Sequence, residues 1–556
     1  MSWLACLGEE GTREAMFSEG AFLVVGAALL LAVALAAFAS PLLRKAYRER
    51  VVRFMGLDQV APRPEGWWRA MGGDAAAVPG AAGGDVTVDA LRAGARTREL
   101  RVLRATVVAW AAFMAVGIFV LGQVVAGAHW ADRVEFAAWA GMLALGPALV
   151  NLPRRWRRPG LVAGVALTVA ALVLTGVIHP DDEPWAEDDW IGLVAAPFLL
   201  WVYAALFGPR LRGVVFPAAL VGWVTVLAFV LPLGWVEPRL GACLELAQAP
   251  EFVASGVGSA WSGALTTVGA GLFVLGLWLG FQALAGLARA IERGWLGELS
   301  VVALVGLAVI AAAFVFGAAP EEGGTGAATP WWPVLWVGAA AAAYALALGR
   351  SPRAPGCPLL LLRVFSRDRR QHALLEAVQD RWRYVGAIQQ AGGPDLVDLN
   401  IDPYECAMFL SGRLYDLFLP EAVSAEQLAG RFNYAQDREG RFRINEMFNF
   451  NTAWRQNVER LIEMSPTILL DVRGLTAERE GTAFEVGLIA RLGVTDRVVA
   501  VGDGTTDWDQ VAARLAEHGR RPEDMPRIDA DAPGALDAIH EALLAKASGL
   551  APGAAS

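Results

Sequence analysis

The residues best placed to do chemistry lie in one stretch, Ser465–Asp503, with the sequence SPTILLDVRGLTAEREGTAFEVGLIARLGVTDRVVAVGD. Thr467–Val472 is an apolar run rich in β-branched residues, which predicts a buried strand. A polar turn leads from it into a helix that begins near Thr482, and Arg497–Val501 predicts a second strand. This order of strand, helix and strand is typical of a parallel, doubly wound sheet, which binds ligands at the carboxyl ends of its strands.

Glu485 is the residue of this stretch that we expect to act as a nucleophile. It lies in the first turn of the predicted helix, just past the carboxyl end of the first strand. In a dry pocket beside a cationic glycosyl transition state, a carboxylate can form a covalent intermediate or stabilise the charge. Asp471 and Arg473 lie at the end of the same strand and would face the same crevice, where they could bind ribose hydroxyls and phosphate respectively.

A purely structural explanation fits the same residues. Thr482 as N-cap and Glu485 at the third helical position form a capping box, in which the carboxylate accepts a hydrogen bond from the backbone N–H of Thr482. Such a cap contributes roughly 1 kcal/mol. Asp471 can equally be a turn-forming residue after its strand. The sequence leaves both explanations open.

Two segments of the C-terminal part resemble a known superfamily. Gly481–Leu488 (GTAFEVGL) resembles a motif of the nucleoside 2-deoxyribosyltransferases, in which the Glu after a strand attacks the anomeric carbon of the sugar. Arg363–Ser366 (RVFS) looks like the opening strand of a TIR domain, a related fold in which some members cleave the nicotinamide bond of NAD. Gly393–Asp395 looks like the Gly-Pro turn of the transferases, but it follows the second predicted strand instead of the first.

The resemblance implies an enzyme that cleaves or transfers an N-glycosidic bond in NAD or a related nucleotide, with Glu485 as the catalytic residue. We expect Ser366 and Arg367 to meet phosphate and Asp395 to orient the sugar; Arg367 could instead face the anionic inner leaflet or solvent. NAD or a nucleotide would be the substrate, and no cofactor is expected. The alternative is a domain that binds a nucleotide or assembles with partners without catalysis, in a membrane receptor or scaffold. Homo-oligomer formation stays open.

The distribution of apolar residues divides the chain of 556 residues, 55% of them hydrophobic. Up to about Gly349 they come in long uninterrupted blocks, and after Cys357 in short runs separated by charges. We therefore expect residues 1–19 to form an outer N-terminal segment and 20–349 a transmembrane domain with a cytoplasmic loop at 44–104. A linker would follow at 350–358, a cytoplasmic α/β domain with a mostly parallel sheet at 359–548, and a flexible tail at 549–556.

The apolar blocks predict a multispan α-helical domain of about nine helices, each close to the length of about 20 residues that crosses a bilayer. The predicted spans are Gly20–Leu43, Thr106–Ala128, Glu135–Leu152, Gly160–Ile178, Ile191–Gly208, Val214–Gly234, Gly263–Leu287, Leu299–Ala318 and Pro333–Leu348. Arg-rich loops alternate with acidic ones, which predicts an outer N-terminus and a cytoplasmic C-terminal domain. The spans carry no charge near their middle, which disfavours a charge-coupled transporter.

Composition also bears on partners and on location. Basic residues are almost all Arg, and with the many Ala and Gly residues this indicates a GC-rich genome and a bacterial inner-membrane protein in contact with the lipid bilayer. The C-terminal part is acidic, which disfavours nucleic-acid binding. The four cysteines and five histidines do not cluster, so no metal site is predicted.

Val86–Arg104 is expected to be a short basic amphipathic helix on anionic lipid or a solvated connecting helix.

The C-terminal part alternates between predicted strands and helices, which is the pattern of an α/β domain. Besides the two strands of the central stretch, we expect strands at Leu359–Phe365 and Ala387–Gln390. Helices are expected at Arg370–Tyr384, Pro403–Leu419, Thr452–Met464, Trp508–His518 and Gly534–Ala547, with Asp402 capping the second. Arg441–Trp454 is expected to be a short strand and a loop rich in aromatics and amides, either lining a pocket or packed on the sheet.

Overall fold

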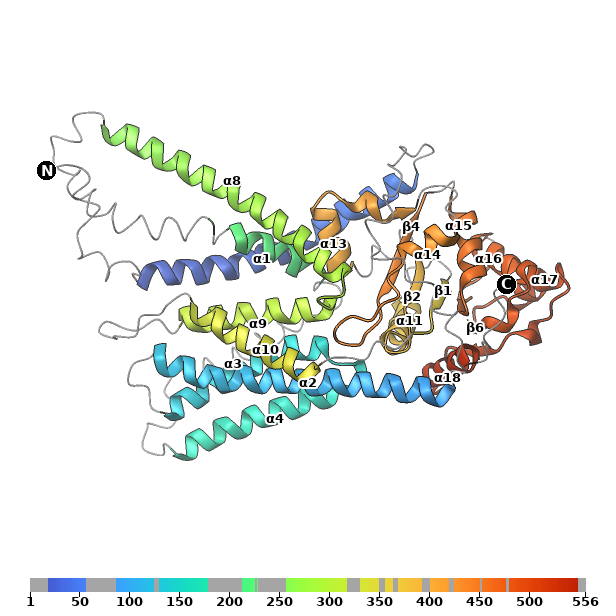
Figure 1. The fold of residues 1–556 in the computed structure, drawn as a ribbon, viewed down its shortest axis with the longest axis horizontal. Coiled ribbons are helices and arrows are strands. Elements are labelled where there is room, and N and C mark those ends of the chain that lie inside the picture. The colour runs from blue at the N-terminus through green and yellow to red at the C-terminus, as the bar shows by residue number, and fades with distance from the viewer. Residues whose placement is uncertain are drawn as a thin grey trace.

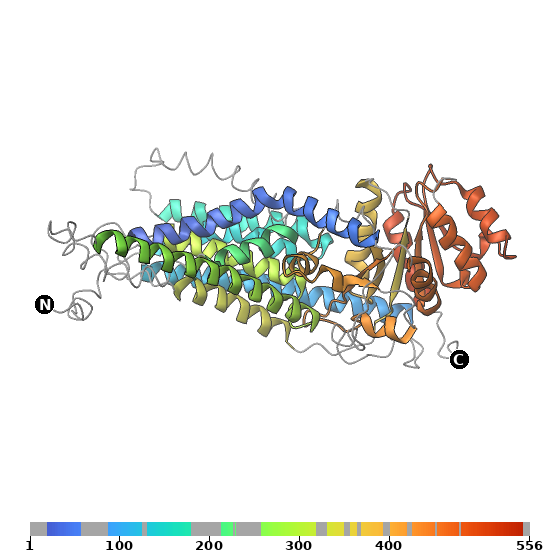
Figure 2. The same ribbon diagram turned by 90° about the horizontal axis from the view of Figure 1, so that it is seen from above.

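A mostly helical region is followed by an α/β domain built on a seven-stranded parallel sheet (Figure 1). The computed structural model describes residues 19–56, 87–124, 130–178, 213–225, 228, 257–317, 331–349, 356–363, 369–392, 401–419, 425–450, 453–476 and 480–548. The helices of the N-terminal region lie side by side along the long axis of the molecule, and the sheet lies beyond one end of them (Figure 2).

Long apolar helices make up the N-terminal region. They are α1 (Glu19–Met55), α2 (Val88–Val124), α3 (Trp130–Asn151), α4 (Arg154–Ile178), α8 (Val257–Glu292), α9 (Glu298–Gly317) and α10 (Trp331–Leu348). Helix α2 packs against α10 and α3, and α3 packs against α4 and α9. Between α2 and α10 the Phe113 and Trp336 rings stack at 4.6 Å, and the Trp336 indole donates a hydrogen bond to the Phe113 carbonyl.

Two of the described helical segments, Val88–Val120 and Thr267–Glu292, are long and apolar enough to cross a membrane. Shorter apolar helices run over Ala137–Asn151, Gly213–Thr225, Glu298–Ala308 and Val334–Leu348. Membrane association therefore has support from length and composition. The predicted span Ile191–Gly208 lies outside the described residues.

The segment between residues 44 and 104, predicted as a loop, is helical at both of its described ends. Helix α1 continues to Met55, and Val86–Arg104 is no separate helix, because α2 runs without a break from Val88 to Val124. The first turns of α2 do not lie on lipid or in solvent alone. Leu91 is buried in the core that also contains Leu359, Val378 and Ile539 of the α/β domain, so this apolar position packs in a protein core.

The sheet has the strand order β3-β4-β2-β1-β5-β6-β7, and all neighbouring strands are parallel. The strands are β1 (Leu359–Arg363), β2 (Ile388–Gly392), β3 (Phe418–Leu419), β4 (Ile444–Asn449), β5 (Thr467–Asp471), β6 (Val498–Gly502) and β7 (Arg527–Asp529). Every residue of β1, β5 and β6 is buried, as in a sheet covered on both faces.

Helices cover the two faces of the sheet, which makes the domain doubly wound as expected. Leu360 and Leu362 of β1 point to a core formed with α14 (Ala425–Arg431), α15 (Trp454–Met464), α16 (Glu480–Leu492) and α17 (Trp508–Ala516). Leu359 and Leu361 point to the opposite core, formed with α2, α11 (Arg369–Trp382) and α18 (Ala535–Ser548). This division follows from the alternation of side chains along a strand.

One predicted helix of the α/β domain is shorter in the structure, and one predicted short strand is found. The helix expected over Pro403–Leu419 ends as α13 (Pro403–Leu410); a left-handed Gly412 and a 3₁₀ turn (Leu414–Leu417) follow it, and then β3. Its predicted cap is confirmed, since Asp402 accepts a hydrogen bond from the Glu405 backbone N–H at 2.6 Å. The short strand expected within Arg441–Trp454 is found as β4, between β2 and β3, and its aromatic residues are buried, as in the packed alternative.

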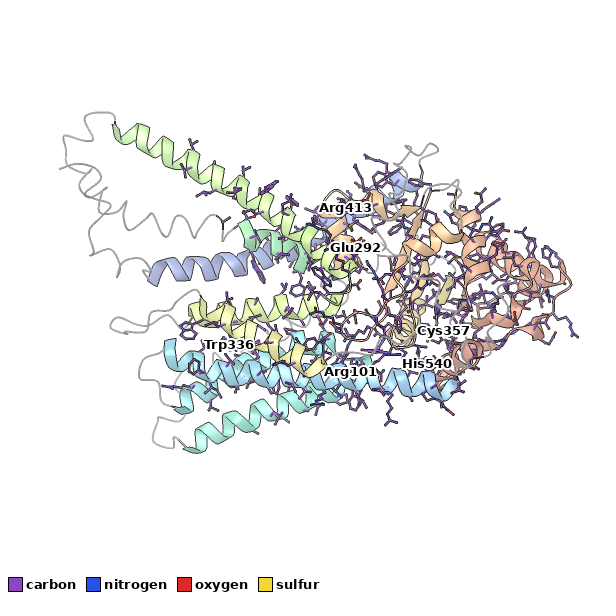
Figure 3. The ribbon with its side chains drawn as sticks, in the orientation of Figure 1. Arg101, Glu292, Trp336, Cys357, Arg413 and His540 are labelled. Carbon is purple, nitrogen blue, oxygen red and sulfur yellow. The ribbon has the colours of Figure 1, made fainter. Side chains whose placement is uncertain are left out.

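The helical region and the α/β domain share a hydrophobic core. Tyr47 of α1 and Leu284 and Ile291 of α8 pack with Met408 of α13 and Phe418 of β3. Glu292, at the end of α8, accepts a hydrogen bond from the Tyr404 hydroxyl at 2.6 Å and lies at this junction (Figure 3). We therefore treat the full chain, and not the α/β domain alone, as the unit for experiments.

Candidate functional site

The carboxyl ends of β1 and β5 form the switch point of the sheet. These strands are neighbours, with Leu359 to Arg363 of β1 in register with Thr467 to Asp471 of β5. The helix that follows β1 is α11, on one face, and the helix that follows β5 is α16, on the opposite face. The connections therefore diverge between the two strand ends, which is where doubly wound sheets bind their ligands.

Glu485 lies on α16 beside this switch point and is buried, with 5% of its surface exposed. Its Oε2 atom is shielded from solvent and accepts no hydrogen bond from the residues that the structure describes. Burial raises the pKa of Glu485 to about 8, and the positive charge of Arg363 offsets part of that rise. A carboxyl of this kind is mostly protonated at neutral pH and ionises when a cation comes near.

The capping-box alternative for Glu485 is not what the structure shows. Helix α16 begins at Glu480, so Thr482 already lies inside the helix and Glu485 lies in its second turn. No hydrogen bond joins the side chain of Glu485 to the backbone of Thr482, both of which are described residues. The burial of Glu485 therefore has no explanation in helix capping, and an unsatisfied buried carboxyl is costly to keep.

Asp471 and Arg473 bond to each other, which is not the arrangement we expected. The Arg473 Nε and Nη2 atoms donate to the two carboxylate oxygens of Asp471 at 2.8 and 2.7 Å. The Arg473 backbone N–H donates to Asp471 at 3.2 Å, which is the turn-forming role considered for this residue. Both side chains are about 95% buried. The pair uses two N–H groups of the guanidinium and both oxygens of the carboxylate, so each charge already has a partner within the chain.

Arg363 is a site residue that the sequence reasoning did not single out. It is the last residue of β1, is 5% exposed, and stands opposite Asp471 in the strand register. The sequence feature that could have identified Arg363 is a charged residue at the end of an otherwise apolar strand. Such a residue lies at the carboxyl edge of the sheet. The described site thus consists of Glu485, Arg363 and the ion pair of Asp471 and Arg473.

The remaining predicted contacts, Ser366, Arg367 and Asp395, lie outside the described residues. Among the residues that are described, no group of three His, Cys, Asp or Glu side chains could hold a metal ion.

The fold and the site define a class, that of doubly wound α/β domains with a buried carboxyl and a buried guanidinium at the switch point. Comparisons of the chain with protein-family models, with characterised proteins and with solved structures found no match.

Proposed function

We propose that the α/β domain cleaves or transfers an N-glycosidic bond in NAD or a related nucleotide, with Glu485 as the catalytic residue. The observation that carries this proposal is the buried Glu485 carboxyl, whose Oε2 has no hydrogen-bond partner among the described residues, beside the switch point of the sheet. The resemblance of residues 481–488 to the deoxyribosyltransferase motif, and of residues 363–366 to a TIR opening strand, supports the same chemistry.

The electrostatics of the site favour a cationic leaving group. The carboxyl of Glu485, with its pKa near 8, is largely neutral in the unliganded protein. The pyridinium of NAD would bring a positive charge next to it and favour the carboxylate. The carboxylate then stabilises, or attacks, the glycosyl carbon as nicotinamide leaves with the bonding electron pair. Because Glu485 is buried, the groups that cover it must move when the substrate enters.

The helical region would anchor this domain to a membrane. We propose a bacterial inner-membrane protein of about nine spans with an outer N-terminus and a cytoplasmic α/β domain, on the grounds of the loop charges and the apolar blocks. In this arrangement the protein is a membrane-anchored effector or sensor, with a role in stress or phage defence.

A second function has one observation in its favour. Asp471 and Arg473 are engaged with each other, as in a site that serves structure. On this alternative the domain binds a nucleotide or assembles with partners without turnover.

The test uses the full chain in lipid nanodiscs, incubated with NAD and with a panel of nucleosides while free base is measured. We expect nicotinamide release by the wild-type protein, and a loss of about a hundredfold or more in a folded Glu485→Gln variant. Glu517→Gln, at the exposed C-cap of α17, is the matched control and should keep full activity. An inactive wild-type protein whose melting temperature NAD raises would support the binding function instead.

A further inference from the structure

A large cavity lies where the helical region meets the α/β domain. Its volume is about 1090 Å³, and its walls come from helices α2, α3, α9 and α10, which lie side by side in both views (Figures 1 and 2). Binding sites for small molecules typically measure about 300–1,000 Å³. The cavity is therefore large enough to hold the chain of a lipid.

The residues that line the cavity lie at one end of each of these helices. Thr106 begins the predicted span of α2, and Ser300 lies in the first turn of α9. Asn151 and Leu348 are the last residues of α3 and α10. On the topology proposed above, all four of these span ends face the cytoplasm. A ligand in the cavity would therefore lie at the depth of the inner leaflet.

The inner wall of the cavity is apolar and built partly of small residues. Ala144 of α3, Ala303 of α9 and Ala341 of α10 leave the space that larger side chains would fill. From Ser300 to Leu307 the wall extends roughly 10 Å along α9. A hydrocarbon chain is the ligand group that such a wall accommodates.

The polar groups deep in the cavity are engaged with one another. Asn151 donates a hydrogen bond to the Tyr344 hydroxyl at 2.7 Å, and Ser300 donates one to Glu439. The Glu439 carboxylate meets the Arg441 guanidinium at 2.7 Å, with 3% and 1% of these side chains exposed. This buried ion pair is neutral as a whole, so the charge that a ligand meets is set at the rim of the cavity.

Two exposed arginines stand at this rim. Arg293 follows α8 and Arg438 precedes β4, and both line the cavity. Their segments touch, because a Cβ atom placed on Gly294 would lie 3.6 Å from the Cα of Asp437. Neither arginine forms an ion pair with a residue that the structure describes. The rim thus presents two guanidinium groups that arise from neighbouring points.

Asp437 also lines the cavity, and it offsets only part of this positive charge. Its carboxylate accepts a hydrogen bond from the backbone N–H of Arg441 at 2.8 Å. Burial and, next, the Glu439 carboxylate raise the pKa of Asp437 to about 7, so the residue is only partly ionised at neutral pH. With two guanidinium groups against one partial negative charge, the rim favours an anion.

The rim also carries exposed apolar side chains. Trp295 and Leu346 line the cavity and are 56% and 82% exposed. The Arg293 guanidinium lies 5.2 Å from the centre of the Trp295 ring. Trp beside a cation is typical of the level of the lipid headgroups. The cavity therefore opens onto a surface suited to lipid, and a lipid with two chains can place one chain inside and leave the other at this surface.

We propose that this cavity binds an acidic phospholipid of the inner leaflet. The headgroup phosphodiester lies between Arg293 and Arg438, with each guanidinium donating to its non-bridging oxygens, and one acyl chain lies between α2, α3, α9 and α10. A zwitterionic headgroup brings a cation that the rim repels. The proposal rests on the membrane anchoring proposed above and is independent of the chemistry at Glu485.

The experiment is photolabelling of the full chain in phosphatidylcholine nanodiscs with a trace of phosphatidylglycerol that carries a diazirine on one acyl chain. We expect labelled peptides from Ser300–Leu307 and Ala340–Ala345. Replacing part of the host lipid by unlabelled phosphatidylglycerol should reduce this labelling about tenfold. Phosphatidylethanolamine or oleate at the same fraction, or inorganic phosphate in the buffer, should reduce it far less.

Each competitor that matched phosphatidylglycerol would overturn one part of the proposal. Equal competition by phosphatidylethanolamine would overturn the acidic headgroup, equal competition by oleate the phosphodiester, and equal competition by inorganic phosphate the lipid. A chain that does not enter nanodiscs would overturn this site together with the membrane anchoring. A chain that is labelled as expected but releases no nicotinamide would leave this site standing and count against the glycosidic function alone.

Paired arginine variants test the headgroup contacts. Arg293→Gln/Arg438→Gln should weaken the competition by phosphatidylglycerol about tenfold. Arg50→Gln/Arg158→Gln removes the same charge at exposed positions of α1 and α4 that do not line the cavity, and it should leave the competition unchanged. Equal effects of the two double variants would show a general attraction of acidic lipid to the protein and would overturn the site.

A second pair of variants tests the place of the acyl chain. Ala341→Trp fills the cavity and should abolish the labelling that unlabelled phosphatidylglycerol competes away. Leu335→Trp, at an exposed position of the same helix, should leave that labelling unchanged. Equal labelling of Ala341→Trp and the wild type, with both proteins folded by thermal melting, would overturn binding in the cavity.

Discussion

Asp471 and Arg473 form a buried ion pair at the carboxyl end of β5, with two side-chain hydrogen bonds of 2.8 and 2.7 Å and one from the Arg473 backbone. The pair stands beside Arg363 in the strand register and close to the switch point at which Glu485 lies. A charge in this interior is tolerated because its partner is fixed two residues away along the same chain.

Removing one partner of this pair should therefore destabilise the domain strongly. Asp471→Ala leaves the Arg473 guanidinium buried without its carboxylate, and we expect the free energy of unfolding to fall by about 3–5 kcal/mol. The double variant Asp471→Ala/Arg473→Ala removes both charges and should lose less than the sum of the two single variants. Thermal melting of the full chain measures this cycle. Additive losses would mean that the two side chains do not stabilise each other.

The stability of the protein should depend on pH through Glu485. Its pKa is about 8 in the folded protein and near 4.5 when unfolded, so the unfolded state releases the proton first as pH rises. The stability that Glu485 contributes is then full below about pH 4.5 and is lost up to about pH 8, by roughly 1.4 kcal/mol per pH unit. Glu485→Gln lacks this titration, so its melting temperature relative to wild type should rise between pH 5 and pH 8. A difference that is constant over this range would contradict the raised pKa.

The rate of glycosidic cleavage should follow the ionisation of the same group. If the carboxylate is the reactive form, kcat/KM for NAD rises tenfold per pH unit and levels near pH 8, the pKa of the free enzyme. The profile of kcat should level at a lower pH, since a bound cation favours the carboxylate. Initial rates of nicotinamide release between pH 5 and 9 measure both profiles. A kcat/KM profile that levels near pH 4.5 would assign the chemistry to a solvated carboxyl.

The docking of α2 on the α/β domain should rest on apolar burial and not on its surface ion pair. Leu91 is 8% exposed in the core shared with β1, α11 and α18, so Leu91→Ala should cost about 2–5 kcal/mol. The adjacent Arg92 bonds to Glu541 of α18 at the surface, and Arg92→Ala should cost less than about 1 kcal/mol. Melting of the two variants side by side measures the contrast. Equal losses of stability in the two variants would show that the surface ion pair contributes as much to the docking of α2 as the burial of Leu91.

The local sequence was sufficient for the elements whose signal is concentrated in a few residues. The runs LLLLR and TILLD are short and mostly apolar, which predicts buried strands, and β1 and β5 are found there. Asp402 caps α13 because an Asp that precedes a Pro at the first helical position can accept a hydrogen bond from the third backbone N–H of the helix, that of Glu405. The doubly wound class followed from the alternation of such strands with helices.

The inner position of strand β4 and the burial of the first turns of α2 did not follow from the local sequence, because both depend on distant partners. Ile444–Asn449 mixes polar and aromatic residues, and it becomes an inner strand only by pairing with β2 and β3. Leu91 is one apolar residue in a basic helix until it meets Val378 and Ile539, which are hundreds of positions away along the chain. Local periodicity carries no information on such contacts.

The sequence by itself determined where the candidate carboxylate lies along the chain and which sheet edge it approaches. Only the tertiary structure decided that Glu485 is buried without a cap partner, that Asp471 and Arg473 neutralise each other, and that Arg363 is the cation beside them. The reason is electrostatic: the protonation and reactivity of a side chain depend on the solvent and the charges within a few ångströms of it, and the packing of several elements sets these together.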